Sequence, residues 1–264
     1  MKATVFLGGG RITSALLAGL RLANYDRPIL VYDRHHHKLQ RLRKLFHVVT
    51  EQNLHRAVER AQLLIVAVQP GSGGRLLDEI GKIERPLTAV CLAAGVPLAR
   101  LRARLGQPLH WARAMPSPAC RSGYGLTALT FDRGFPAAAK PGVRSLFARV
   151  GLVLEIPESK FDPFTVTYSC SHGYHALATL AGAAEKLGLD RKTALTAAAH
   201  ALADGILGWR ESKMSLANLL HEAATPGGIA AGVMEAMDSA GYKKVVGRGL
   251  AAGLERARRN AKRM

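Results

Sequence analysis

A glycine-rich segment near the start of the chain has the residue types and spacing of a phosphate-binding turn. Gly8 and Gly10 follow a short apolar segment and precede a helical pattern from Ile12 to Leu22. Gly8 permits a tight turn, Gly10 lets the backbone approach phosphate groups, and free N–H groups at a helix start face negative charge. The third small position holds Thr13 or Ser14 instead of glycine. The motif predicts a nucleotide diphosphate site, with an ordinary strand–turn–helix as the alternative.

The end of the second predicted strand holds groups that bear on which dinucleotide would bind. Asp33 stands where a carboxylate would bind the ribose hydroxyls of NAD, although a turn residue or a helix N-cap is the alternative. Arg34 follows at once, and residues 35–38 continue a cationic cluster that favours the 2′-phosphate of NADP. Three consecutive histidines point in divergent directions, so we expect a solvated loop there and no metal site. The sequence thus favours NADP, with NADPH preferred and NADH as the alternative.

The first part of the chain alternates short apolar segments with amphipathic ones. This alternation predicts an α/β fold with an N-terminal Rossmann-type, doubly wound parallel sheet that has helices on both faces. We expect strands at residues 2–7, 29–32, 47–49, 63–68, 87–92, 109–113 and 125–131, and helices at 12–22, 38–46, 54–60, 74–83 and 97–105.

The pattern changes near residues 157–163, and the chain beyond is almost entirely helical and rich in alanine, which suits close helix packing. The sequence therefore predicts two domains, residues 1–160 with the dinucleotide site and an all-α domain at residues 161–264. Helices are expected at 165–187, 191–211, 215–221, 228–240 and 243–260.

Composition limits the classes of protein to consider. The net charge is +18, yet the basic residues are spread along the chain, and the densest group, at 256–263, suits the end of a last helix. We therefore expect no nucleic-acid partner, and attraction of an anionic substrate and cofactor is a milder consequence of the charge. The longest aliphatic run, residues 63–68, is too short to cross a membrane. Cys91, Cys120 and Cys170 are odd in number and widely separated, which favours a reducing compartment and a cytoplasmic protein.

Six short motifs follow one another along the chain. Phe6–Thr13 reads F-L-G-G-G-R-I-T, Glu51–Asn53 reads E-Q-N, and Val68–Pro70 reads V-Q-P. Leu92–Val96 reads L-A-A-G-V, Arg113–Ser117 reads R-A-M-P-S, and Thr225–Gly232 reads T-P-G-G-I-A-A-G. In this order they resemble the motifs F-I-G-x-G-N-M-A, D-N, V-K-P, A-A-G-[IV], R-x-M-P-N and S-P-G-G-T-T-I-A-G of the pyrroline-5-carboxylate reductases, the enzymes of the last step of proline synthesis. The likeness covers nearly the whole length of the chain.

The resemblance implies an NADP-dependent oxidoreductase that reduces the C=N bond of 1-pyrroline-5-carboxylate to proline by hydride transfer from the nicotinamide. It also implies that the helical domain forms at least a homodimer and helps to bind the small-molecule substrate. By the same resemblance, the cofactor-binding residues are Gly8, Gly10, Arg11, Ile12, Thr13, Arg34, Asn53, Val68, Gln69, Pro70, Ala93, Ala94, Gly95 and Pro116, and the substrate-binding residues are Thr225, Gly227, Gly228, Ile229 and Ala230.

Several positions depart from the family pattern. Ala230 and Ile229 replace the two threonines of S-P-G-G-T-T, Gln69 replaces the lysine of V-K-P, and Ser117 the asparagine of R-x-M-P-N. Lost hydroxyl groups change which substrate a polar site prefers. His172 stands where the family has proline and is a candidate proton donor, with a structural histidine as the alternative. Two other functions stay open, a paralogue that reduces a different imine or carbonyl compound and a non-catalytic nucleotide-binding relative.

Overall fold

The apolar segments of the first part of the chain form the strands of one sheet. In the computed structural model, which describes residues 2–263, the eight strands have the order β3-β2-β1-β4-β5-β6-β7-β8. Strands β1 to β6 pair in parallel, β7 is antiparallel to β6, and β8 is parallel to β7. The strands are β1 (Ala3–Leu7), β2 (Ile29–Tyr32), β3 (Val49–Glu51), β4 (Ala61–Val66), β5 (Leu87–Cys91), β6 (Leu109–Pro116), β7 (Gly125–Phe131) and β8 (Gly151–Glu155).

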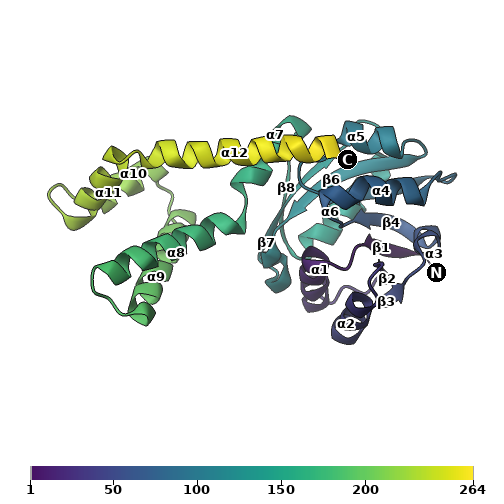
Figure 1. Cartoon of the computed structure of the whole chain (residues 1–264), viewed down its shortest axis with the longest axis horizontal. Helices are drawn as coiled ribbons and strands as arrows, with labels where there is room; N and C mark the ends of the chain where they lie inside the picture. Colours follow the sequence, from purple (N-terminus) through teal and green to yellow (C-terminus); the bar gives the residue numbers. More distant parts are fainter. Residues whose placement is uncertain (1, 264) are drawn as a thin grey trace. The chain divides into compact units, whose positions relative to one another are not determined.

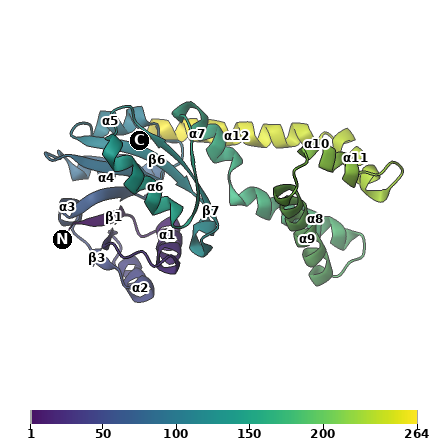
Figure 2. The same cartoon turned by 180° about the vertical axis from the view of Figure 1, so that it is seen from behind.

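Helices cover both faces of this sheet (Figures 1 and 2). Along β1, Val5 and Leu7 pack with α3, α4 and α5, whereas Phe6 packs on the opposite face with α1, α2 and α6. All of β1 is buried, as a parallel strand between two helical layers must be. The predicted doubly wound sheet is confirmed. Its helices are α1 (Arg11–Leu22), α2 (His36–Phe46), α3 (Leu54–Glu59), α4 (Pro70–Ile80), α5 (Leu98–Arg104) and α6 (Lys140–Ala148).

Some predicted boundaries were wrong. The third strand is Val49–Glu51 and not residues 47–49, because His47 has a φ of 50° and ends α2 in the left-handed conformation. The fourth strand ends at Val66, so the residues that follow form a loop before α4. That helix begins at Pro70, four residues earlier than predicted, since proline suits the first turn of a helix. The prediction also missed α6 and β8.

The helical part of the chain is divided more finely than expected. The predicted helix at 165–187 is two helices, because the backbone leaves the helical region at Tyr168 and the Ser169 hydroxyl accepts a hydrogen bond from the Ser171 N–H at the start of the second. The helices are α7 (Glu158–Thr167), α8 (Cys170–Lys186), α9 (Arg191–Glu211), α10 (Leu216–Ala223), α11 (Ile229–Ser239) and α12 (Tyr242–Arg263).

The chain divides into two compact units. The first contains the sheet, its helices, α7 and the end of α12, and spans residues up to 168 and from 252 onward. The second, residues 169–251, contains α8 to α11 and the start of α12. The boundary near residue 160 that the sequence predicts separates domains by function, whereas these two units are defined by packing. The predicted boundary therefore stays a prediction.

A buried arginine joins α7 to the sheet in the first unit. Arg113 of β6 is 1% exposed, and its Nη2 donates to Asp162 Oδ1 at 2.6 Å. Its Nη1 lies 3.4 Å from Glu158 Oε1, and its guanidinium stacks 4.3 Å from the centre of the Phe161 ring. The same Glu158 oxygen accepts the Leu98 N–H at 2.6 Å. One carboxylate therefore joins the start of α5 to β6 and α7.

Gly19 allows α1 to pack against η1, the short 3₁₀ helix Pro118–Ser122. A Cβ at Gly19 would meet the Cys120 carbonyl oxygen far inside van der Waals contact. Backbone cannot move aside cheaply, so we expect Gly19→Ala to lower the free energy of unfolding by about 1–3 kcal/mol despite the better helix propensity of alanine. Urea unfolding followed by circular dichroism measures this.

The matched control is Gly142→Ala in α6, because a Cβ there meets nothing within 4 Å among the described residues. Its free energy of unfolding should rise by up to about 1 kcal/mol. Equal effects of the two substitutions would contradict the packing argument.

Candidate functional site

The turn after β1 brings backbone close to the end of β4. Gly8 has a φ of 111°, and a Cβ there would lie 2.9 Å from the Ala67 carbonyl oxygen. Both the backbone conformation and the lack of space therefore require glycine. Gly10 precedes α1 and faces open space, since nothing described lies within 4 Å of where its Cβ would be. No described side chain caps the start of α1, and its first turn contains no acidic residue. The first N–H groups of the helix are thus available to an anion.

The Asp33 carboxylate holds this turn to the loop after β2. Its Oδ2 accepts the Gly9 N–H at 2.8 Å, and its Oδ1 accepts the His35 N–H at 2.9 Å. His35 Nδ1 lies 2.9 Å from Oδ1, and Lys38 Nζ lies 3.5 Å from Oδ2. Asp33 is 6% exposed, so both oxygens are committed inside the protein. Of the two readings of Asp33, the structure favours the turn residue over the ribose ligand.

These contacts determine the charge of Asp33. Burial raises its pKa, but hydrogen bonds from the His35 and Gly9 N–H groups, the His35 ring and the Lys38 charge all favour the ionised form. Together they hold the pKa of Asp33 below its ordinary value. The carboxylate is therefore ionised at neutral pH and balances part of the positive charge around it.

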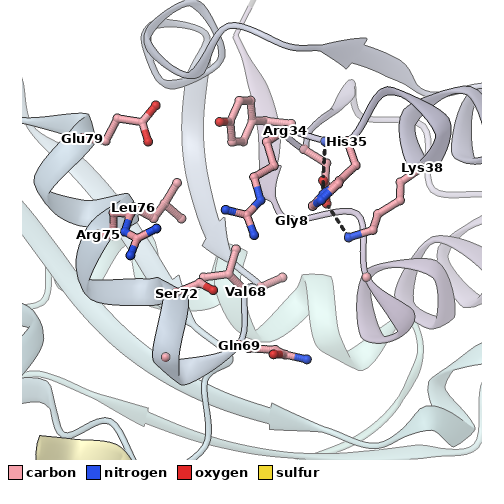
Figure 3. Close-up of a pocket in the computed structure, with 15 residues that line it drawn as sticks. Gly8, Arg34, His35, Lys38, Val68, Gln69, Ser72, Arg75, Leu76 and Glu79 are labelled. Atoms are coloured by element: carbon pink, nitrogen blue, oxygen red, sulfur yellow. Dashed lines mark hydrogen bonds and ion pairs between the residues drawn. The ribbon is translucent and has the colours of Figure 1, made fainter. Parts of the chain in front are cut away.

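A cavity of about 400 Å³ opens at the carboxyl ends of β1, β2 and β4, at the switch point of the sheet where such folds bind ligands. Figure 3 shows Arg34 reaching into it from the end of β2, with Arg75 and Ser72 projecting from α4. The cavity is lined by Gly8, Gly10, Tyr32, Asp33, Arg34, His35, Lys38, Ala67, Val68, Gln69, Gly71, Ser72, Arg75, Leu76 and Glu79.

The structure brings five of the predicted cofactor residues to this cavity, namely Gly8, Gly10, Arg34, Val68 and Gln69. The other predicted residues of this region are not among those that line the cavity. Thr13 is fully buried, and its hydroxyl donates to the Gly8 carbonyl at 2.5 Å, which braces the turn from behind. Asn53 caps α3, where its Oδ1 accepts the Arg56 N–H at 3.0 Å. Arg11 and Ile12 form the first turn of α1, and Pro70 forms that of α4.

The predicted cofactor residues Ala93, Ala94, Gly95 and Pro116 lie at the same edge of the sheet. Ala93 to Gly95 follow β5, and Pro116 ends β6. The end of α12 covers this loop in the first unit, because the Asn260 side chain lies 3.4 Å from the Ala94 carbonyl oxygen and Gly95 packs against the Ala257 backbone. This edge continues from the cavity along the carboxyl ends of the parallel strands.

The predicted substrate residues lie in the second unit. Thr225 to Gly228 form a turn closed by a 2.8 Å hydrogen bond from the Gly228 N–H to the Thr225 carbonyl, and Gly228 precedes α11. Ile229 is 90% exposed. The first turn of α11 contains no acidic residue, and no described side chain caps it. His172 lies in the first turn of α8.

The sequence interpretation missed the part of the cavity formed by α4. Ser72, Arg75, Leu76 and Glu79 are spaced as residues i, i+3, i+4 and i+7, which places them on one face of a helix. This spacing is visible in the sequence once the helix begins at Pro70. Because the predicted helix began at residue 74, it did not include Ser72, and the face that these four residues share was not recognised.

Neither membrane nor metal features emerge from the described residues. Within residues 2–263, no helix is both long and apolar enough to pass through a membrane. No group of three or more metal-ligating side chains gathers within that range. Burial raises the pKa of the Cys91 thiol to about 11 and also raises that of Cys120, so both are protonated thiols at neutral pH.

Comparison with known proteins gives the family. A family model described as pyrroline-5-carboxylate reductase dimerisation matches residues 158–260, and one described as NADP oxidoreductase, coenzyme F420-dependent, matches residues 4–91. The pyrroline-5-carboxylate reductase of Thermus thermophilus is 34% identical over 229 residues, which cover 84% of this chain and 85% of that protein. The chain belongs to the pyrroline-5-carboxylate reductase family. The resemblance inferred from the six motifs is confirmed.

Other comparisons agree with this membership. The pyrroline-5-carboxylate reductase of Corynebacterium melassecola is 27% identical over 250 residues, covering 92% of this chain and 93% of that protein. The crystal structure of Plasmodium falciparum pyrroline carboxylate reductase with NADP bound matches with a TM-score of 0.87 over 98% of each chain, at 20% identity. The fold of the pyrroline-5-carboxylate reductases thus extends over 98% of this chain.

Asp33→Asn tests the role of the buried carboxylate. The amide cannot accept from all the groups around it, so we expect the free energy of unfolding at pH 7 to fall by about 1–3 kcal/mol. The native pKa is depressed, so the contribution of Asp33 is complete above the unfolded-state pKa of about 3.9 and is lost as pH falls through the lower native pKa. The difference between wild type and variant should therefore shrink below about pH 4.

Urea unfolding between pH 3 and 7 measures this difference. The control is Asp26→Asn, an exposed carboxylate, which should change the free energy of unfolding by less than about 0.5 kcal/mol at every pH. A destabilisation by Asp33→Asn that does not vary with pH would contradict the argument.

Proposed function

We propose that this protein catalyses the NADPH-dependent reduction of the C=N bond of 1-pyrroline-5-carboxylate to proline. The observation that carries the proposal is the cation-rich cavity at the switch point of the sheet, in a chain of the pyrroline-5-carboxylate reductase family. Relatives with that name match nine-tenths of the chain, and one solved relative of the same fold is described with NADP bound.

The residues at the cavity fit a dinucleotide phosphate. Gly10 leaves room above the turn, where any larger residue would place a side chain. The uncapped start of α1 supplies N–H donors for the pyrophosphate, and Arg34 and Lys38 supply positive charge at the adenosine end. We assign Arg11, Ile12 and Thr13 to the pyrophosphate through their backbone N–H groups, and Asn53, Val68, Gln69 and Pro70 to the walls of the groove.

When bound, the dinucleotide supplies a hydride to the imine carbon. The protein must hold the substrate ring, exclude water and provide a proton for the nitrogen. We assign the substrate carboxylate to the start of α11, where Gly227 and Gly228 expose N–H groups next to the Thr225 hydroxyl at a positive helix end. Ile229 and Ala230 would line the apolar side of that site. His172 is the side chain we propose to test as the proton source.

A different imine is the second candidate substrate. Ala230 offers a methyl group where the family has a hydroxyl, and Gln69 offers an uncharged amide where the family has a lysine. The first change removes a hydroxyl group and the second removes a positive charge, and a site that loses a hydrogen-bonding group loses discrimination for the polar substrate. Cyclic imines without a carboxylate, such as 1-pyrroline, therefore belong in the same assay.

The second unit supports a homodimer. Among its described residues only Ala181, Ala194 and Ala198 are buried hydrophobics, so its helices lack a core of large side chains within one chain. Large apolar residues stay exposed instead, and contiguous exposed apolar surface marks protein interfaces. Those at least half exposed are Tyr174, Leu187, Ile206, Leu207, Trp209, Leu216, Ile229, Val233, Tyr242 and Val245.

The three free cysteines fit a cytoplasmic setting, because thiols stay reduced in that compartment.

Sedimentation tests the dimer. We expect wild type to sediment at twice the 28.3 kDa of the chain or more, and Ile206→Glu in α9 to shift it toward the monomer, because a charge would be buried in the interface. The control is Leu22→Glu in α1, the same change at an apolar residue of similar exposure in the first unit. A monomeric wild type, or equal effects of both substitutions, would refute the assignment.

Enzyme activity tests the reaction. Loss of absorbance at 340 nm with NADPH and 1-pyrroline-5-carboxylate should accompany equimolar formation of proline. Charge-assisted contacts at the adenosine end should make kcat/KM at least about tenfold higher for NADPH than for NADH. Turnover of 1-pyrroline alone would support the second candidate, and binding of NADP⁺ without turnover of any imine would contradict both.

A further inference from the structure

Arg75 of α4 faces the same cavity as Arg34 but comes from the opposite wall. Arg34 lies in the loop between β2 and α2, whereas Arg75 lies in the second turn of α4, the helix that follows β4. In Figure 3 both guanidinium groups point into the cavity above Val68 and Ser72. The adenosine end of the cavity is therefore bounded by cations on two sides.

The charges of these two arginines are unbalanced in the protein. No carboxylate among residues 2–263 lies within ion-pair distance of Arg34 or Arg75. Lys38, in contrast, is paired with Asp33. Glu79 also lines the cavity, and Figure 3 shows it beyond Arg75 along α4, so it would repel a phosphate from the far end. Two guanidinium groups in one cavity repel each other until an anion lies between them.

We propose that Arg75 and Arg34 together bind the 2′-phosphate of NADP, so that α4 as well as the loop after β2 sets the dinucleotide preference. This rests on the proposed function only in that NADP is the ligand. Guanidinium groups match phosphate oxygens in bidentate geometry, and a terminal phosphate offers three of them. Asp33 gives no competing preference for NAD, since its two oxygens are committed to the Gly9 and His35 N–H groups.

The test is dinucleotide binding by isothermal titration calorimetry, which needs no turnover. Arg75→Gln should weaken NADP⁺ binding about tenfold or more and leave NAD⁺ binding within about twofold, because NAD⁺ has no 2′-phosphate. Adenosine 2′,5′-bisphosphate and AMP correspond to the adenosine ends of NADP⁺ and NAD⁺. Arg75→Gln should therefore weaken binding of adenosine 2′,5′-bisphosphate and leave binding of AMP nearly unchanged. Arg75→Lys keeps the charge without the bidentate fork and should fall between.

The matched control is Arg100→Gln on α5, which removes the same charge from an exposed arginine outside the cavity. Arg100→Gln should change neither the affinity for NADP⁺ nor the affinity for NAD⁺. An equal loss of NADP⁺ and NAD⁺ binding by Arg75→Gln would overturn the proposal and place Arg75 at the adenine or pyrophosphate. An unchanged NADP⁺ affinity would overturn it as well.

These outcomes separate the inference from the proposed function. Wild type that binds NADP⁺ selectively through Arg75 but reduces no imine would support the inference and contradict the proposed reaction. Wild type that binds neither dinucleotide would overturn both.

Discussion

The ion pairs of Arg113 are the interaction on which the arrangement of the first unit depends. Its guanidinium is almost fully buried at the sheet, and burial of an unpaired charge costs several kcal/mol. Asp162 and Glu158 of α7 therefore have to stay against β6, with Phe161 between them. Glu158 also receives the N–H that begins α5. The loop after β5, the end of β6 and the first helix beyond the sheet are thereby fixed to one another.

A second carboxylate acts in the same way at the other side of the switch point. Asp33 is ionised, yet its charge is used to hold the backbone of the glycine turn and of the loop after β2. The turn is also braced by Thr13 from within the helix. These internal bonds leave the outward N–H groups and the arginine side chains for a ligand. Asp33 and Thr13 thus shape the site, whereas other residues, such as Arg34 and Arg75, face a bound ligand.

Much of the fold follows from residue periodicity, and the site follows only in part. Alternating apolar segments predicted β1, β2 and β5 almost to the residue, because buried parallel strands have few alternatives. The short β3 was misplaced because His47, inside the predicted span, adopts the left-handed conformation that ends α2. The edge strand β8 was missed although its sequence, Gly-Leu-Val-Leu-Glu, is apolar. Thr13 and Asp33 were recognised as important residues, but their partners were not. Asp33 accepts the N–H of Gly9, which is 24 residues away in the sequence, and Thr13 donates across the glycine turn, so periodicity predicts neither contact. Arg75 was missed because its direction depends on where α4 begins.

The contact between the end of α12 and the loop after β5 has a consequence for how the protein folds during synthesis. Gly95 packs against the Ala257 backbone, and Asn260 reaches the Ala94 carbonyl. The first unit is therefore discontinuous, and its final piece leaves the ribosome only after every helix of the second unit. A nascent chain can form the sheet early, but the loop after β5 can make its contacts with α12 only once that last helix has been synthesised. Completion of the dinucleotide domain is thus coupled in time to synthesis of the whole helical region.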